Sequence, residues 1–166
     1  MGGVDKIIDF IKNIRFTTED IEYLRGTGQF TEDFLAYLKD FKFTGDLYAI
    51  PDGTPVFANE PLVTVKAPII EAQIIETILL SYLNANIMYT TAARRVVEAA
   101  DGIGVMEFGA RRALGPEAAV EASKCAVIAG CVGTSNVLAG QEYGVKEMGT
   151  MAHSLVNEED SEYEAF

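Results

Sequence analysis

IGVMEFGARRALGPEAAVEASKCAVIAGCVGTSNVLAGQEYGVKEMGTMAHS, residues 103–154, is the stretch of sequence that decides the expected fold. It contains three short apolar runs, at 103–108, 125–129 and 145–148, and each is followed by a turn rich in Gly, Ser or Thr. Helix-forming segments lie between the runs. A short apolar run, a turn and a helix in this order are typical of the βα units of a parallel sheet. We therefore predict an α/β fold for this part of the chain.

The segments between the apolar runs carry helix signals. Pro116 suits the first turn of a helix because its missing N–H would be unpaired there anyway, and 117–124 is strongly helix-forming. A second short helix is expected at 136–143, closed by Gly144. Ser135 or Asn136 can cap that helix, and the same turn can also present free amides to a ligand. The residues alone leave capping and ligand binding both open.

Polar side chains gather in the turns that follow the apolar runs. In α/β folds the ligand sites lie at the carboxyl ends of the strands. The groups expected at these ends are two guanidiniums, several hydroxyls and the only histidine of the chain. The residues that carry them are Arg111, Arg112, Thr134, Ser135, Asn136, Thr150, His153 and Ser154. This set of groups suits an anionic ligand.

Each of these groups also has a structural interpretation. Arg111 and Arg112 present planar forks that pair with carboxylate or phosphate, but either could form an ion pair with one of the many carboxylates of the chain. His153 has no second histidine and no nearby cysteine with which to form a metal site or a dyad. By itself it indicates an ordinary core or surface histidine.

Composition narrows the possible functions. The chain has 166 residues, 49% of them hydrophobic, and a formal net charge of −12. The acidic balance argues against a nucleic-acid surface or an anionic membrane surface, either of which needs a basic face. Cys125 and Cys131 lie in or beside apolar segments without metal-ligand spacing, so we expect buried free thiols and a reducing, cytoplasmic location. Neither a signal peptide nor a transmembrane helix is indicated.

The first third of the chain favours helices and then a small antiparallel sheet. Apolar residues at helical spacing predict a helix over 4–13, and Thr17 or Thr18 and then Thr31 are suited to cap two more. Farther on, the patterns at 47–50 and 61–66 predict two strands.

A long helix follows over 69–100, begun by Pro68 and ended by Asp101 and Gly102. Its apolar residues fall nearly all round, which indicates burial on several sides, and a break is expected near 84–86. We therefore predict three parts: an α+β part at 1–68, a connecting helix at 69–100 and a βα part at 101–166. The acidic end, 157–166, is expected to be a helix or a frayed tail.

At this point the motifs resemble a known family. FGARRALGPEAA, GTSNVLAG and GTMAHS closely resemble the central part of the nicotinate phosphoribosyltransferases of NAD salvage. The resemblance continues upstream through FTTEDIEYL, FKFTGDLYAIPDGTPVFANEPLVTV and PIIEAQIIET, so that it spans nearly the whole chain. It implies that 101–166 forms the opening βα units of an irregular, incomplete α/β barrel.

The resemblance also implies roles for individual residues. The aromatic ring and the arginine of the family's FGxR segment match Phe108 and Arg111, which would stack on the pyridine ring and lie near the ligand. Arg112 belongs to the same run. The turn with Ser135 and Asn136 would lie on the base and ribose side of the site. In the family, the histidine of the GTxAH segment is phosphorylated by ATP.

His153 stands at the position of that histidine, and a neutral imidazole is a competent nucleophile toward phosphorus. Thr150 and Ser154 would be its hydrogen-bonding neighbours. The implied reaction joins nicotinate to phosphoribosyl pyrophosphate, releases pyrophosphate and forms nicotinate mononucleotide, driven by ATP hydrolysis. The resemblance implies ATP and Mg²⁺ as well as a homo-oligomer, such as a dimer. No metal-binding or ATP-binding motif is visible in this chain.

The chain also departs from the family pattern. It resembles an interior fragment, without the DxYxxTM-like segment, the remaining barrel strands, the acidic magnesium site and the Gly-rich phosphate loop. Cys131 and Val132 replace a usual Phe-Asp pair, and an acidic segment at 157–159 replaces an apolar one. Two functions stay open: part of a nicotinate phosphoribosyltransferase, or a non-catalytic remnant that binds a ligand or dimerises. The related nicotinamide and quinolinate enzymes fit GARRALGPEAA and GTMAHS less well.

Overall fold

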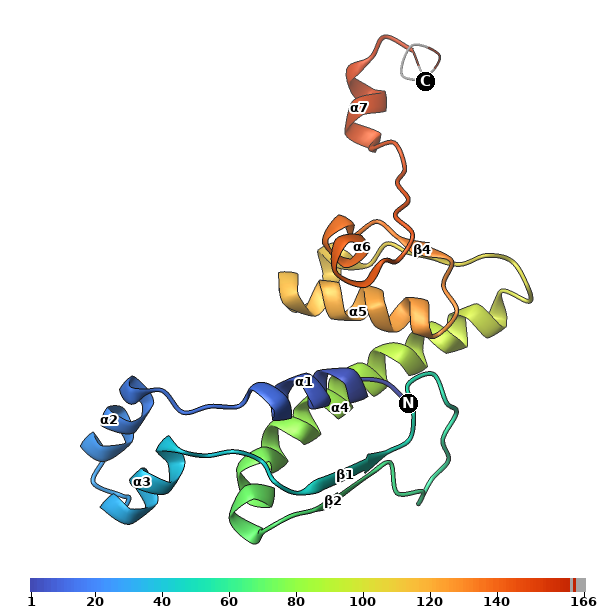
Figure 1. Ribbon diagram of the computed structural model, residues 1–166. Coiled ribbons are helices and arrows are strands. Elements are labelled where there is room, and N and C mark those ends of the chain that lie inside the picture. Colours follow the sequence, from blue (N-terminus) through green and yellow to red (C-terminus); the bar gives the residue numbers. More distant parts are fainter. Residues whose placement is uncertain (162, 164–166) are drawn as a thin grey trace. The chain divides into compact units, whose positions relative to one another are not determined.

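The computed structural model describes residues 1–161 and 163, and it divides the chain into two compact units (Figure 1). Unit 1 comprises Met1–Met88 and unit 2 comprises Tyr89–Phe166. The boundary between them falls inside the long helix α4, Ile69–Ala99. Unit 1 is helical with an antiparallel sheet and unit 2 has parallel strands and helices, which confirms the predicted α/β class.

Unit 1 begins with the three expected helices, α1 (Val4–Asn13), α2 (Thr18–Gly26) and α3 (Glu32–Lys39). The helices α2 and α3 lie side by side (Figure 1), and Arg25 joins them because its Nε lies 2.8 Å from Glu32 Oε1. Their shared core contains Leu35 and Leu38, which are buried on one face of α3. The helical spacing of these apolar residues is therefore the spacing that packing requires.

A capping box starts α2, and of the two candidate caps Thr17 and Thr18 it is Thr17 that forms it. The backbone N–H of Asp20 donates to Thr17 Oγ1 at 3.2 Å, and the backbone N–H of Thr17 donates to Asp20 Oδ2 at 2.7 Å. The Thr17 hydroxyl also donates to Asp20 Oδ2 at 2.7 Å. These hydrogen bonds, that of the Thr17 side chain first, hold the pKa of the Asp20 carboxyl below its ordinary value. The cap is therefore coupled to the ionised form of Asp20.

Replacing Thr17 by alanine is expected to raise the pKa of Asp20 toward its ordinary value, because the strongest of these hydrogen bonds is lost. A depressed carboxyl pKa contributes stability above the unfolded pKa and loses it as pH falls through the folded pKa. The stability difference between wild type and Thr17→Ala should therefore shrink in acid. An NMR titration of the Asp20 side-chain carbon measures the shift, with Thr31→Ala, the cap of α3, as control. An Asp20 pKa equal in wild type and Thr17→Ala contradicts the prediction.

The predicted antiparallel strands are β1, Asp46–Ala49, and β2, Val63–Lys66. Their register pairs Asp46 with Lys66 and Ala49 with Val63. The inward residues of both strands pack on a core formed by α1 and α4, in which Ile7 and Ile75 are 0% and 1% exposed. Buried Glu71 of α4 accepts hydrogen bonds from the backbone N–H and the hydroxyl of Thr44, at 2.6 and 2.9 Å.

The break predicted near 84–86 is absent, because α4 runs without interruption from Ile69 to Ala99. Asn86, a polar residue of the segment where the break was expected, is 3% exposed. Its side-chain amide donates to the carbonyl oxygen of Tyr82 in the same helix at 2.9 Å. The polar group is thus satisfied along the helix, and the interruption is unnecessary.

Unit 2 is built on two very short parallel strands, β3 (Met106–Glu107) and β4 (Gly133–Thr134). Glu107 pairs with Thr134, and Thr134 forms a further parallel bridge with Glu147. The helices α5 (Pro116–Ile128) and α6 (Val137–Tyr143) follow β3 and β4, in the order expected of βα units. A 3₁₀ turn, η1 (Ala110–Arg112), lies between β3 and α5. A short helix, α7 (His153–Glu158), follows the apolar run at 145–148.

The prediction of a strand at 125–129 is wrong. These residues lie at the end of α5, where Cys125 and Ala126 are buried on its packed face, and the strand is Gly133–Thr134 instead. The helix that starts at Pro116 continues to Ile128, and Gly130, whose φ of +112° favours glycine, lies just beyond its end. An apolar run of this length is compatible with a buried helix as well as with a strand. The run at 145–148 is also not a full strand, since it contributes only the bridge at Glu147.

Three further expectations can be compared with the structure. Cys125 and Cys131 are both buried free thiols, as predicted, and burial raises the pKa of Cys131. No helix within residues 1–161 is long and apolar enough to cross a membrane. The prediction of an acidic helix or tail at 157–166 falls partly outside the described residues, and α7 ends at Glu158.

Candidate functional site

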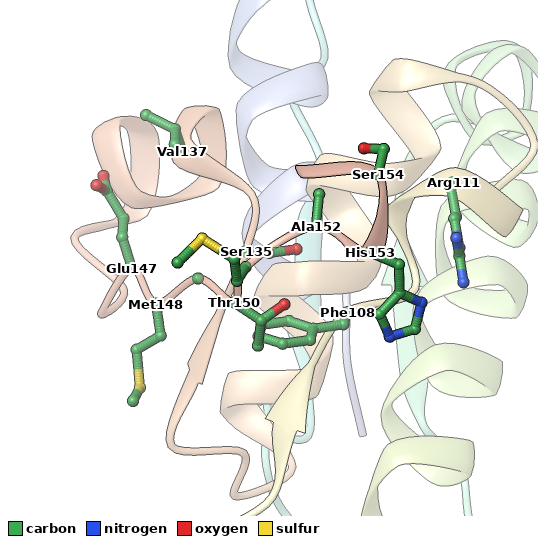
Figure 2. Close-up of a pocket in the computed structure, with 12 residues that line it drawn as sticks. Phe108, Arg111, Ser135, Val137, Glu147, Met148, Thr150, Ala152, His153 and Ser154 are labelled. Atoms are coloured by element: carbon green, nitrogen blue, oxygen red, sulfur yellow. The ribbon is translucent and has the colours of Figure 1, made fainter. Parts of the chain in front are cut away.

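A cavity of about 820 Å³ in unit 2 brings together the three motif segments (Figure 2). The turn after β3 contributes Phe108 and Arg111, and the turn after β4 contributes Ser135. Residues 147–154 contribute most of the remaining wall. The residues that line the cavity are Phe108, Arg111, Ser135, Val137, Glu147, Met148, Gly149, Thr150, Met151, Ala152, His153 and Ser154.

Local structure explains why these segments converge. The strands β3 and β4 are parallel neighbours, and Glu147 forms a parallel bridge with Thr134. The three motif segments therefore begin at the same edge of this small sheet. The carboxyl ends of neighbouring parallel strands are where α/β folds form ligand sites. Gly133 lets β4 lie close to the backbone of Lys146, since a Cβ at position 133 would lie 2.7 Å from the carbonyl oxygen of Lys146.

Six of the predicted binding and catalytic residues line this cavity. They are Phe108, Arg111, Ser135, Thr150, His153 and Ser154. Phe108 is 37% exposed, so part of its ring is open to the cavity. The imidazole of His153 and the hydroxyls of Thr150 and Ser154 come from the same short segment (Figure 2).

Arg112 and Asn136 are not among the residues that line the cavity. Arg112 ends the 3₁₀ turn η1 and is exposed. The side-chain oxygen of Asn136 accepts from the backbone N–H of Ala139 at 3.3 Å and so caps α6. The GTSN turn therefore serves both purposes with different residues. Asn136 caps the helix, and Ser135 lines the cavity.

The ion-pair interpretation of the two arginines is not what the structure shows. Within residues 1–161, neither the Arg111 nor the Arg112 guanidinium forms an ion pair, and both side chains are exposed. Arg111 therefore presents to the cavity a guanidinium that has no ion pair with these residues. A guanidinium of this kind can pair with the carboxylate or phosphate of a ligand.

A partly buried carboxylate, that of Glu107, connects the segments that form the site, and the sequence motifs gave no role to it. Glu107 Oε2 lies 2.6 Å from Thr134 Oγ1 and 2.8 Å from Ser123 Oγ, and Glu107 Oε1 accepts from the backbone N–H of Gly109. Both hydroxyl residues are 0% exposed. The signal that could have found this group is a single glutamate inside the apolar run IGVMEF, because a charged residue in a partly buried strand needs hydrogen-bond partners.

The donor set of the cavity does not fit a magnesium ion. Mg²⁺ is held in proteins by carboxylates together with water and substrate phosphates. Of the lining residues only Glu147 has a carboxylate, and residues 1–161 contain no group of three or more His, Cys, Asp or Glu that could hold a metal ion. What the arrangement offers is an aromatic face, a guanidinium, three hydroxyls and an imidazole. These groups suit a planar anion.

Comparison with known proteins gives one family along the chain. The N-terminal domain of nicotinate phosphoribosyltransferase matches residues 1–84, and the nicotinate phosphoribosyltransferase family domain matches residues 103–165. A Mycobacterium tuberculosis (strain H37Rv) protein named nicotinate phosphoribosyltransferase pncB2 is 47% identical over 165 residues, which cover 99% of this chain and 36% of that protein. The Bacillus subtilis (strain 168) nicotinate phosphoribosyltransferase is 41% identical, over 99% of this chain and 34% of its own length.

A solved structure agrees with these relatives. The crystal structure of human nicotinic acid phosphoribosyltransferase matches with a TM-score of 0.85 and 31% identity, over 94% of this chain and 32% of the human chain. The chain thus spans about a third of the length of the relatives it matches. Because the two family domains together match nearly all of its residues, the chain belongs to the nicotinate phosphoribosyltransferase family of NAD salvage.

Proposed function

We propose that this chain supplies the nicotinate-binding part of a nicotinate phosphoribosyltransferase. The reaction joins the ring nitrogen of nicotinate to the anomeric carbon of phosphoribosyl pyrophosphate, and pyrophosphate leaves with the electrons of the broken C–O bond. The observation that carries the proposal is the cavity on which the FGAR, GTS and GTMAHS segments converge. Relatives named for this activity support it.

The cavity wall matches the two recognisable features of nicotinate. The partly exposed ring of Phe108 offers a flat face for the pyridine ring, as aromatic side chains commonly do in ligand sites. The Arg111 guanidinium offers paired N–H donors for the carboxylate. The Ser135 hydroxyl, which follows the carboxyl end of the neighbouring strand β4, is proposed to meet a polar group of the ring or the ribose.

His153 is proposed as the residue that accepts a phosphoryl group from ATP. Its side chain is exposed on the cavity wall, which is a requirement for in-line attack by an imidazole nitrogen. In that step the nitrogen–phosphorus bond forms, the bond from the γ-phosphorus to the bridging oxygen breaks, and ADP leaves. Hydrolysis of the phosphohistidine would then drive nucleotide formation.

Self-association as a homo-oligomer is also part of the proposal, and analytical ultracentrifugation measures it.

The first test is direct binding by the purified chain, measured by isothermal titration calorimetry with nicotinate and with nicotinamide. The two ligands share the pyridine ring, but only nicotinate has a carboxylate for Arg111. Nicotinate is expected to bind more tightly. Equal affinity for the two ligands, or no binding of nicotinate by the folded chain, would contradict the proposed recognition.

The second test separates the family reaction from binding alone. The chain is incubated with nicotinate, phosphoribosyl pyrophosphate, ATP and Mg²⁺, and nicotinate mononucleotide is measured, with His153→Ala as control. Product that depends on His153 supports the catalytic function. Binding without product supports the second candidate, a non-catalytic module that binds the ligand. That candidate is favoured by the lack of a group of metal-binding side chains within residues 1–161.

A further inference from the structure

Glu107 lies directly before the FGAR segment but does not line the cavity. We propose that Glu107 is a positioning residue, whose carboxylate holds the turn of residues 108–111 and the turn of residues 134–136 in a fixed relation so that Phe108, Arg111 and Ser135 share one cavity. The inference rests on the proposed function for the identity of the ligand, nicotinate. The positioning itself rests on contacts within the chain.

The contacts of Glu107 join its own strand, β3, to four other pieces of unit 2. Its carboxylate accepts from the hydroxyls of Thr134 in β4 and Ser123 in α5, at 2.6 and 2.8 Å, and from the N–H of Gly109 in the FGAR turn. Its backbone carbonyl oxygen accepts from the N–H of Ser135 at 3.1 Å. One residue therefore fixes the strand on which it lies, the next strand, the helix that covers them and both turns.

The hydrogen bonds continue from Glu107 to the second turn. Thr134 Oγ1 donates to Glu107 and accepts from the backbone N–H of Asn136 at 3.0 Å. Asn136 in turn caps α6. A continuous path thus runs from the Gly109 amide through the carboxylate and the Thr134 hydroxyl to the start of α6. Any change at the carboxylate reaches both turns that contribute to the cavity.

An ionised carboxylate is the group that this arrangement requires. Three donors converge on its two oxygens, and hydrogen bonds to a charged acceptor are the stronger kind. Glutamine keeps the shape but removes the charge and replaces one acceptor oxygen by an NH₂ group. With that NH₂ at the Oε2 position, the hydroxyls of Ser123 and Thr134 must turn from donating to accepting, and the hydrogen bonds to a charged acceptor are lost. Ser123 and Thr134 are 0% exposed, so this rearrangement takes place inside the packing, where the Ser123 hydroxyl can donate to the carbonyl oxygen of Ala119 at 2.9 Å instead.

Gly109 has a place in the same arrangement. Its φ of −90° is accessible to any residue, so the backbone conformation does not require glycine. A Cβ at this position would lie 3.0 Å from Glu107 Oε1, closer than an ordinary contact. The glycine of the FGAR motif thus lets the amide approach the carboxylate.

A first experiment tests the positioning without any ligand. Amide resonances of ¹⁵N-labelled wild type, Glu107→Gln and Glu142→Gln are compared. Glu142 is an exposed glutamate of α6, and its replacement makes the same change of charge. We expect Glu107→Gln to shift Gly109, Arg111, Ser135 and Asn136, with far-UV circular dichroism unchanged, and Glu142→Gln to leave these four amides in place. Unshifted Gly109 and Ser135 amides in folded Glu107→Gln would overturn the proposal.

A second experiment tests whether Glu107 acts through Arg111. Nicotinate affinity is measured in a double-mutant cycle of Glu107→Gln and Arg111→Ala. Glu107→Gln alone is expected to weaken binding about tenfold, the effect of losing one hydrogen bond to a charged group. In the Arg111→Ala background the loss should be several-fold smaller, because the group being positioned is gone. Equal losses in both backgrounds would assign Glu107 a merely structural role and overturn the proposal.

The two experiments fail in different ways. If wild type does not bind nicotinate, the proposed function is wrong, while the amide shifts of the first experiment still decide whether Glu107 couples the two turns. If wild type binds nicotinate and Glu107→Gln binds it equally well, the positioning role is wrong and the proposed function stands.

Discussion

Replacing Arg111 by alanine is expected to weaken nicotinate binding by roughly ten- to a hundredfold, because hydrogen bonds to a charged group contribute about 1.5–3 kcal/mol and each 1.4 kcal/mol is a factor of ten. The guanidinium lies on the cavity wall and forms no ion pair with the described residues. The guanidinium can therefore donate to a ligand carboxylate without first leaving an ion pair with those residues. Isothermal titration calorimetry of the purified variant measures the change.

Arg112→Ala is the matched control for this prediction. It removes the same charge from the next residue of the same turn, but Arg112 does not line the cavity. The chain has a net charge of −12, so the loss of any cation makes it less attractive to an anion at long range. If both variants weaken binding equally, and the loss disappears in high salt, the effect is this general attraction and Arg111 does not contact the ligand.

The two arginines also show what a sequence motif leaves undecided. The RR pair predicts an anion site, but it does not say which of two neighbours faces the ligand. In the structure they lie in a 3₁₀ turn, which has about three residues per turn, so neighbouring side chains point roughly 120° apart. Only Arg111 lies on the cavity wall. The direction of a side chain in a short turn depends on hydrogen bonds that a pattern of residue types does not contain.

The helices were the most predictable part of the fold. The apolar spacing indicates α1 and the Thr31 cap indicates α3, and the structure has both helices where these signals lie. The strands of unit 2 were less predictable, because β3 and β4 have only two residues each and the strand period needs a longer run. The run at 125–129 was misassigned for the same reason. Its apolar residues are buried, but within the end of a helix.

The motif segments of the site could be predicted from the sequence, but the Glu107 carboxylate that connects them could not. The segments with Phe108, Ser135 and His153 are recognisable in the sequence, and the structure brings all three to one cavity. The carboxylate behind them was not found, because its partners Ser123 and Thr134 come from α5 and β4. The roles of the cavity residues remain predictions that the binding and activity measurements decide.

The largest loss of stability is expected from Ile75→Ala in α4. Ile75 is 1% exposed and belongs to the core that holds α1 and the antiparallel sheet on this helix. Truncating a buried isoleucine to alanine removes apolar contacts and leaves a cavity, which lowers the free energy of unfolding by about 2–5 kcal/mol. Domains of this size are stable by only about 5–15 kcal/mol, so the loss is a large fraction of the total. Urea denaturation followed by far-UV circular dichroism measures it.

Ile69→Ala is the control, since it makes the same replacement in the same helix at a side chain that is 72% exposed. Alanine has the higher helix propensity, so this variant is expected to be as stable as wild type or slightly more stable. The difference between the two variants therefore isolates burial from propensity. Equal midpoints for Ile75→Ala and Ile69→Ala would mean that Ile75 is not packed in a core, and that α4 does not hold unit 1 together through this face.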